Sequence, residues 1–336
     1  MKLGVDVFSL RQQGWTPIQH VEYAHKLGLD VVQFSERQFF ESLDEDYLRP
    51  VKVRADELGI EVNVGMLSIC PSSTIFNTKH GTATEQLQAM IRAAELFESP
   101  VVRCVMGTNA DRRTGTPLSV HLENTLKTLR SVREQALDLG IKIAIETHAG
   151  DLPGRTLAAL IEEAGPDYVG ACPDAGGVFW SAESPFVTLE YLAPYVVTSH
   201  VRDTAIWKDP AGAWIQSVAM GDGNVRIDEW SRLFVEKCPQ ASYTLEVITG
   251  GAPRLIDYVS PEFWDVYPET LAKDLAQYEK LAREGKPFTG NMLTGPMGGM
   301  PDEYRKAFVI QERMDFERSV RYCQEVLGLG ENWKQK

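Results

Sequence analysis

Residues 139–148 read LGIKIAIETH and contain the unit from which much of this chain is built. Gly140 is the kind of residue that ends a helix, and the apolar run after it is followed at once by Glu146 and His148. A run that is apolar on successive residues is typical of a parallel strand covered on both faces. The same leucine–glycine ending precedes apolar runs at residues 27–28 and 58–59.

Eight such apolar runs alternate with amphipathic stretches, which predicts eight strands separated by helices. The expected strands are residues 2–7, 30–34, 60–66, 100–105, 141–146, 168–173, 196–201 and 243–247. This alternation over about 250 residues is typical of a (β/α)₈ TIM barrel. A doubly wound nucleotide-binding domain would need a GxGxxG segment after the first strand, and residues 8–11 contain no glycine. We therefore predict an α/β fold, a (β/α)₈ TIM barrel forming a single domain over residues 1–336.

Two segments are longer than a minimal barrel requires. Residues 249–301 form an insert after the eighth strand, and we expect a lid or substrate wall on the catalytic face, where loops after barrel strands lie. Residues 202–226 are expected to be a long loop that carries Trp207 and Trp214. Together these segments suggest a deep site that could accept a glycoside.

Composition limits the partners. The chain has 34 Lys and Arg against 47 Asp and Glu, a formal net charge of −13, which argues against nucleic acid. No apolar stretch is long enough for a membrane span, and the first residues do not resemble a signal peptide. The expectation is a cytoplasmic protein without a membrane or nucleic-acid partner, and a homo-oligomer is left open.

Four successive strand ends carry residues that are costly to bury: Glu146, Asp174, His200 and Glu246. At the mouth of one barrel, three carboxylates would repel one another, so a divalent cation is the natural counter-charge. Three oxygen donors and one imidazole suit Mn²⁺, Mg²⁺ or Co²⁺ better than a closed structural zinc site. The pattern therefore predicts one divalent metal ion, with Mn²⁺ as the first expectation and Mg²⁺, Co²⁺ or Zn²⁺ as alternatives.

The chain resembles the xylose-isomerase-like TIM-barrel superfamily, in its sugar phosphate isomerase/epimerase branch, which includes the ketose 3-epimerases. The motifs that carry the resemblance are IETH at 145–148, PDAG at 173–176, HVRD at 200–203, LE at 245–246 and MGDGN at 220–224. Two positions depart from the 3-epimerase pattern, because Gly177 stands where a histidine is common and Gln33 where a glutamate is common.

The resemblance implies roles for individual residues. It makes Glu146, Asp174, His200 and Glu246 the metal ligands, with Glu146 and Glu246 also acting as acid and base. It places His148 and Arg202 near the substrate. Asp203 is expected to orient His200, as metal-bound imidazoles usually require. Independently of the resemblance, the aromatic faces of Phe8 and Trp207 could contact a sugar.

The expected activity is that of a metal-dependent sugar isomerase or epimerase, which removes a proton next to a carbonyl to form an enediolate. A lyase or hydrolase that acts on a keto-sugar or keto-glycoside through the same carbanion is an alternative. A non-catalytic sugar-binding barrel is an alternative of another class. An abasic-site endonuclease is disfavoured, since only His148 and His200 of six histidines follow late strands. The sugar, and whether it is phosphorylated or glycosidic, is left open.

Overall fold

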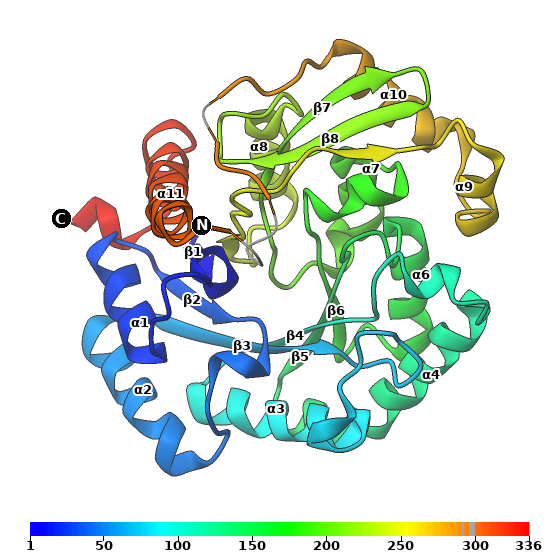
Figure 1. Cartoon of the computed structure of the whole chain (residues 1–336). Coiled ribbons are helices and arrows are strands. Elements are labelled where there is room, and N and C mark those ends of the chain that lie inside the picture. The colour runs from blue at the N-terminus through cyan, green and yellow to red at the C-terminus, as the bar shows by residue number, and fades with distance from the viewer. Residues whose placement is uncertain (291, 296–299, 336) are drawn as a thin grey trace.

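A curled parallel sheet forms the centre of the molecule (Figure 1). The computed structural model describes residues 1–290, 292–295 and 300–335. Seven strands follow one another in the order β6-β5-β4-β3-β2-β1-β9. Their bounds are β1 (Leu3–Asp6), β2 (Val31–Phe34), β3 (Glu61–Ser68), β4 (Val101–Val105), β5 (Lys142–Glu146), β6 (Val169–Cys172) and β9 (Tyr243–Leu245). The predicted TIM-barrel fold is confirmed.

Residues 196–201 occupy the remaining place in the barrel, between β6 and β9. They do not form a continuous strand, but single bridges join Val196 to Ala171 and Val201 to Leu245. Pro173 has no amide hydrogen to donate beyond the end of β6, but a further bridge joins Asp174 to His200. The His200 amide instead donates to the carbonyl of Pro173, which places His200 at the end of the barrel where β6 finishes.

Helices cover the outside of the sheet (Figure 1). In chain order they are α1 (Pro17–Lys26), α2 (Glu45–Leu58), α3 (Ala83–Phe97), α4 (Leu118–Ser131), α5 (Arg133–Asp138), α6 (Gly154–Ala164), α7 (Pro185–Leu192), α8 (Ile227–Lys237) and α11 (Asp302–Arg321). The capping box of Thr16 and Gln19, with Pro17 at the first position, explains where α1 begins. Gly59 ends α2 in the left-handed conformation, with φ 63°.

The expected loop at 202–226 is instead largely an antiparallel hairpin, so that expectation was wrong. Strands β7 (Asp203–Asp209) and β8 (Gly212–Val218) pair along their length, and β10 (Arg254–Ile256) adds a third strand. The turn has the sequence DPAG, and the Ala211 amide donates to the Asp209 side chain at 2.9 Å. Such a turn between two aromatic-rich runs is a hairpin signal.

The segment after β9 packs against the loop that follows β4 and against the hairpin. It contains α9 (Pro261–Val266) and α10 (Ala272–Glu284), which lie beside the hairpin in Figure 1. Arg112 donates to the carbonyl of Val266 at 2.9 Å and to Glu269 at 2.7 Å, and Lys208 pairs with Glu279 at 2.7 Å. Residues 291 and 296–299 of the predicted 249–301 insert lie outside the described residues. Within the described part of the chain, no helix combines the length and apolar character needed to cross a membrane.

Candidate active site

The four residues predicted from the strand ends come together at one end of the barrel. Glu146 ends β5, Asp174 follows β6, His200 lies on the bridging segment and Glu246 follows β9. Carboxylate oxygens of Glu146, Asp174 and Glu246 lie within 4.8 Å of one another. His200 Nδ1 is 2.7 Å from Glu146 Oε2 and 3.8 Å from Glu246 Oε1. All four side chains are buried.

Arg202 reaches the same cluster. Its Nε donates to Asp174 Oδ1 at 3.1 Å, its Nη2 contacts Asp174 Oδ2, and its Nη1 is 3.2 Å from Glu246 Oε2. Its stem passes over Gly176, where a Cβ would lie 2.5 Å from Arg202 Cγ. The glycine of the PDAG motif is therefore what lets Arg202 reach the carboxylates.

Three further polar residues come from the first half of the barrel, and the sequence-based prediction missed them. Arg103 on β4 places Nε and Nη2 each 2.5 Å from Glu146 Oε2. Asp6 and Gln33 face the other nitrogen of the histidine, since Asp6 Oδ2 is 3.3 Å and Gln33 Nε2 is 3.0 Å from His200 Nε2. The available signal was a single polar residue in each of the otherwise apolar runs LGVD, VVQF and VVRCV.

The cluster has the charge and donor set of a divalent cation site. The cluster sets the carboxylates of Asp6, Glu146, Asp174 and Glu246 against two guanidinium groups and the His200 ring. Among the described residues, Glu146 Oε1 is buried without a hydrogen-bond partner, and Glu246 Oε2 and His200 Nδ1 are buried with only the ion-pair contacts given above. Buried polar atoms are rarely left in this state, so their convergence fits a bound cation. The donor types are those that Mn²⁺ and related ions accept.

The two glutamates have opposite electrostatic surroundings. Burial acts to raise the pKa of Glu146, but the positive charges of Arg103 and His200 outweigh it and hold this pKa well below its ordinary value. For Glu246, burial outweighs the charges of Arg202 and His200 and raises the pKa to about 8. The two carboxylates are therefore not equivalent.

His148 is held by its backbone loop. Its Nδ1 lies 2.8 Å from the carbonyl of Gly107, which can only accept, so Nδ1 carries the hydrogen and Nε2 is an acceptor. Asp151 fixes the loop by accepting from the amides of Gly107, His148 and Leu152 at 2.6 to 3.0 Å. Burial lowers the pKa of His148, which favours the neutral ring.

Comparison with known proteins assigns the chain to a family. The profile of the xylose isomerase-like TIM barrel family matches residues 21–277, more than half of the chain. The chain belongs to this family.

Two curated proteins are similar to part of the chain. YihM, an uncharacterized protein of Escherichia coli K12, is 26% identical over 132 residues, which is 39% of each chain. The 3-oxo-isoapionate decarboxylase of Pectobacterium atrosepticum is 23% identical over 185 residues, or 55% of this chain and 60% of its own length. The matches thus span less than two thirds of either curated relative.

Among solved structures, D-psicose 3-epimerase in the presence of D-fructose superposes with a TM-score of 0.61. The superposition covers 98% of this chain and 100% of that chain, at 12% identity. At this level of identity the likeness concerns the fold alone.

The two departures from the family's 3-epimerases have local causes. At Gly177, a Cβ would lie 2.4 Å from Asp174 Oδ2 and 2.5 Å from the carbonyl of Thr147, so this backbone leaves no space for a side chain. Gln33 stands directly against His200, where a glutamate would add another negative charge.

Asp203 does not take the place expected of it. Its carboxylate accepts from the amides of Thr204, Gly221 and Gly223 at 2.8 to 3.0 Å. At Gly223 a Cβ would lie 2.0 Å from Asp203 Oδ1, which explains the glycines of the MGDGN segment. The prediction that Asp203 orients His200 needs correction, because Asp6, Gln33 and Glu146 surround that ring instead.

The two predicted aromatic contacts lie on separate elements. Phe8 is in a 3₁₀ turn (Val7–Leu10), with the Arg11 guanidinium 4.6 Å from its ring centre. Trp207 on β7 stacks on Trp214 of β8, with ring centres 6.5 Å apart. Their role as substrate contacts stays a prediction.

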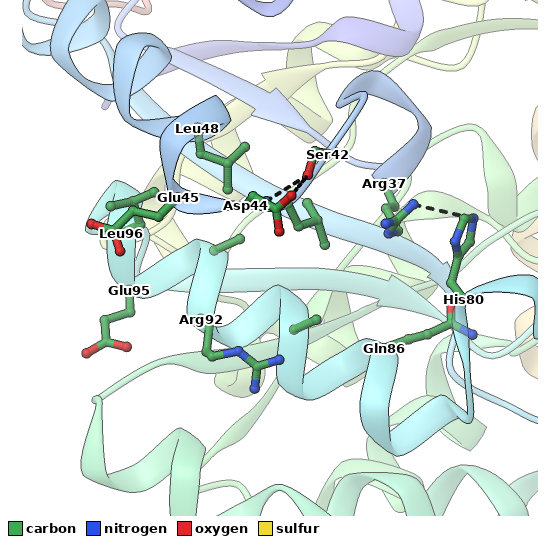
Figure 2. Close-up of a pocket in the computed structure, with 13 residues that line it drawn as sticks. Arg37, Ser42, Asp44, Glu45, Leu48, His80, Gln86, Arg92, Glu95 and Leu96 are labelled. Atoms are coloured by element: carbon green, nitrogen blue, oxygen red, sulfur yellow. Dashed lines mark hydrogen bonds between the residues drawn. The ribbon is translucent and has the colours of Figure 1, made fainter.

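A cavity of about 880 Å³ lies away from this site, on the outside of the barrel between α2 and α3 (Figure 2). Arg37 and His80 face one another at one end of it, 3.4 Å apart, and Arg92 and Glu95 of α3 line it. None of its lining residues, all within the described part of the chain, belongs to the donor cluster. The volume of a cavity therefore does not identify the candidate active site in this protein.

Proposed function

We propose that the protein is a divalent-metal-dependent enzyme that removes a proton next to the carbonyl of a sugar or sugar derivative. The observation that carries this proposal is the convergence of three carboxylates and one imidazole in a buried cluster, in which Glu146 Oε1 has no hydrogen-bond partner among the described residues. Membership of the xylose isomerase-like family supports an enzyme, and a 3-epimerase among the structural neighbours supports a sugar.

Glu146, Asp174, His200 and Glu246 would hold the ion, with Mn²⁺ expected before Mg²⁺, Co²⁺ or Zn²⁺. When bound, the ion supplies positive charge that stabilises the negative charge developing on the substrate oxygens. Glu246, whose Oε2 is paired only with Arg202 Nη1 at 3.2 Å, takes the proton from carbon. His148 Nε2 can accept a hydrogen bond from a substrate hydroxyl, and Arg202 can bind a negatively charged substrate group.

A lyase is the second candidate. A 3-oxo-isoapionate decarboxylase is among the relatives, and loss of CO₂ from a 3-oxo acid leaves an enolate, the same kind of anion that proton removal next to a carbonyl forms. The substrate partner in either case is a small sugar, sugar acid or glycoside.

Calorimetric titration with Mn²⁺ tests the metal site. We expect one Mn²⁺ per chain, and Asp174→Asn should weaken binding by about a hundredfold or more because it removes both a donor and a charge. His80→Asn, in the exposed part of the outer cavity, is the matched control and should bind as the unaltered protein does. Failure of the folded protein to bind Mn²⁺ would reject the metal enzyme and favour a non-catalytic barrel.

A further inference from the structure

We propose that Arg103 restricts Glu146 to a single available oxygen, which leaves Glu246 as the only carboxylate able to move the proton. The inference rests on the proposed function and specifies it: the reaction is one-sided, an isomerisation or an elimination, and not an epimerisation between two glutamates.

Arg103 is placed rigidly by its neighbours. The pairing of Arg103 with Ala144 sets it on the same face of the sheet as Glu146, two residues further along β5. Its side chain is only 3% exposed, and its Nη1 points at the carbonyls of Ser35 and Met66, 3.4 Å from each. Gly65 of β3 makes this approach feasible, since a Cβ there would lie 2.6 Å from the Arg103 carbonyl and 3.1 Å from its Cβ.

The consequence for Glu146 follows from counting its oxygens. A glutamate that both binds a cation and transfers a proton needs one oxygen for each task. Arg103 places two nitrogens 2.5 Å from Oε2. Only Oε1 has no hydrogen-bond partner among the described residues, and the cation would use it.

Glu246 differs from Glu146 in its polar contacts and in its exposure. Its Oε2 has one charged neighbour, Arg202 Nη1 at 3.2 Å, against two nitrogens at 2.5 Å on Glu146 Oε2, and Arg202 is itself anchored on Asp174. The Glu246 side chain is 8% exposed and that of Glu146 is 0% exposed, so Glu246 is the one that reaches toward the opening.

One base, Glu246, is then sufficient to remove the carbon-bound proton. The C–H bond breaks, its proton goes to Glu246, and its electron pair moves to the carbonyl oxygen to form an enediolate. In an isomerisation, Glu246 returns the proton to the former carbonyl carbon, and the proton of the neighbouring hydroxyl passes to the former carbonyl oxygen, so that the hydroxyl carbon becomes the new carbonyl. In an elimination, the electron pair of the enediolate expels a leaving group, which departs with its bonding electrons and the negative charge while Glu246 keeps the proton. Inversion at one carbon would require a second group that delivers a proton to the opposite face, and Glu146 has no oxygen left for it.

The first arm of the test uses Mn²⁺ alone, measured by calorimetry on the full chain. Arg103→Gln removes one positive charge and releases Glu146 Oε2, so we expect Mn²⁺ to bind about tenfold more tightly. Arg103→Lys keeps the charge and should change the affinity by less than about threefold. Unchanged or weaker binding in folded Arg103→Gln, with normal binding by the unaltered protein, overturns the inference.

The second arm follows D-fructose and D-tagatose with saturating Mn²⁺ in D₂O by proton NMR. Formation of the C3 epimer by the unaltered protein overturns the inference whatever the first arm gives. If either sugar exchanges a carbon-bound proton, Glu246→Gln should abolish this exchange and Glu146→Gln should retain at least about a tenth of it. Equal losses in the two variants would contradict a single base. Absence of Mn²⁺ binding by the unaltered protein is a different result, and it rejects the proposed function itself.

Discussion

The two halves of the barrel contribute different chemistry to the same cluster. The second half, from β5 onward, supplies the four donors Glu146, Asp174, His200 and Glu246. The first half supplies Gln33 and Arg103, which contact those donors, and Asp6, which lies with His200 and Glu246 in a second group of close ligand atoms. The difference teaches that, in the proposed function, the second half supplies most ligands of the cation and the first half determines how those ligands are held.

The largest effect should come from breaking the contact between the halves. Arg103→Met leaves Glu146 buried without its charge partner, which we expect to cost about 3–5 kcal/mol of unfolding free energy. Urea denaturation without added metal measures it. Arg103→Met combined with Glu146→Leu should recover most of this loss, because no charge is then left unpaired. A cost below about 1 kcal/mol for Arg103→Met would mean that the halves are not coupled through this pair.

A smaller effect should follow from altering how the first half presents His200. Gln33→Leu removes the amide 3.0 Å from His200 Nε2, and loss of such a partner typically weakens metal binding by about tenfold or more. Calorimetric titration with Mn²⁺ checks it. Gln86→Leu is a comparable amide substitution on α3, outside the cluster, and should leave the affinity unchanged. Equal Mn²⁺ affinities for the unaltered protein, Gln33→Leu and Gln86→Leu would show that Gln33 does not influence metal binding.

The smallest effect concerns the packing of the first half. Burial lowers the pKa of His20 on α1 to about 4, below its ordinary value of 6.5, so the folded protein favours the neutral ring. The unfolded chain therefore binds the proton first, and stability present above pH 6.5 is lost as the pH falls toward 4. We expect a loss of about 1 kcal/mol between pH 6.5 and 5, measured by urea denaturation. His20→Phe should flatten this dependence, and an equally steep curve in that variant would assign the acid sensitivity elsewhere.

The same comparison shows what the sequence could and could not reveal. The barrel and the four donors were predictable because each strand, its glycine signal and its terminal polar residue are contiguous in the chain. Asp6, Gln33 and Arg103 were not, because each is a lone polar residue in an apolar run whose partner appears only when distant strands close into a barrel. Arg103 meets Glu146 across 43 positions of the chain, and Gln33 meets His200 across 167.

Errors in the prediction arose where local and tertiary signals compete. The turn DPAG between β7 and β8 is a local hairpin signal, although the segment was predicted to be a loop. Asp203 is adjacent to the HVRD histidine in sequence, yet the glycine-rich segment provides three amides for its carboxylate, and that backbone cage determines its position.

The central claim is that the four donors of the second half bind one divalent cation, and a crystal structure of the protein soaked with Mn²⁺ tests it most directly. We predict an anomalous-difference peak about 2.0–2.3 Å from oxygens of Glu146, Asp174 and Glu246 and from His200 Nδ1, with Arg103 still on Glu146 Oε2. A cluster without such a peak at saturating Mn²⁺, in which Arg202 still bridges Asp174 and Glu246, would contradict the account.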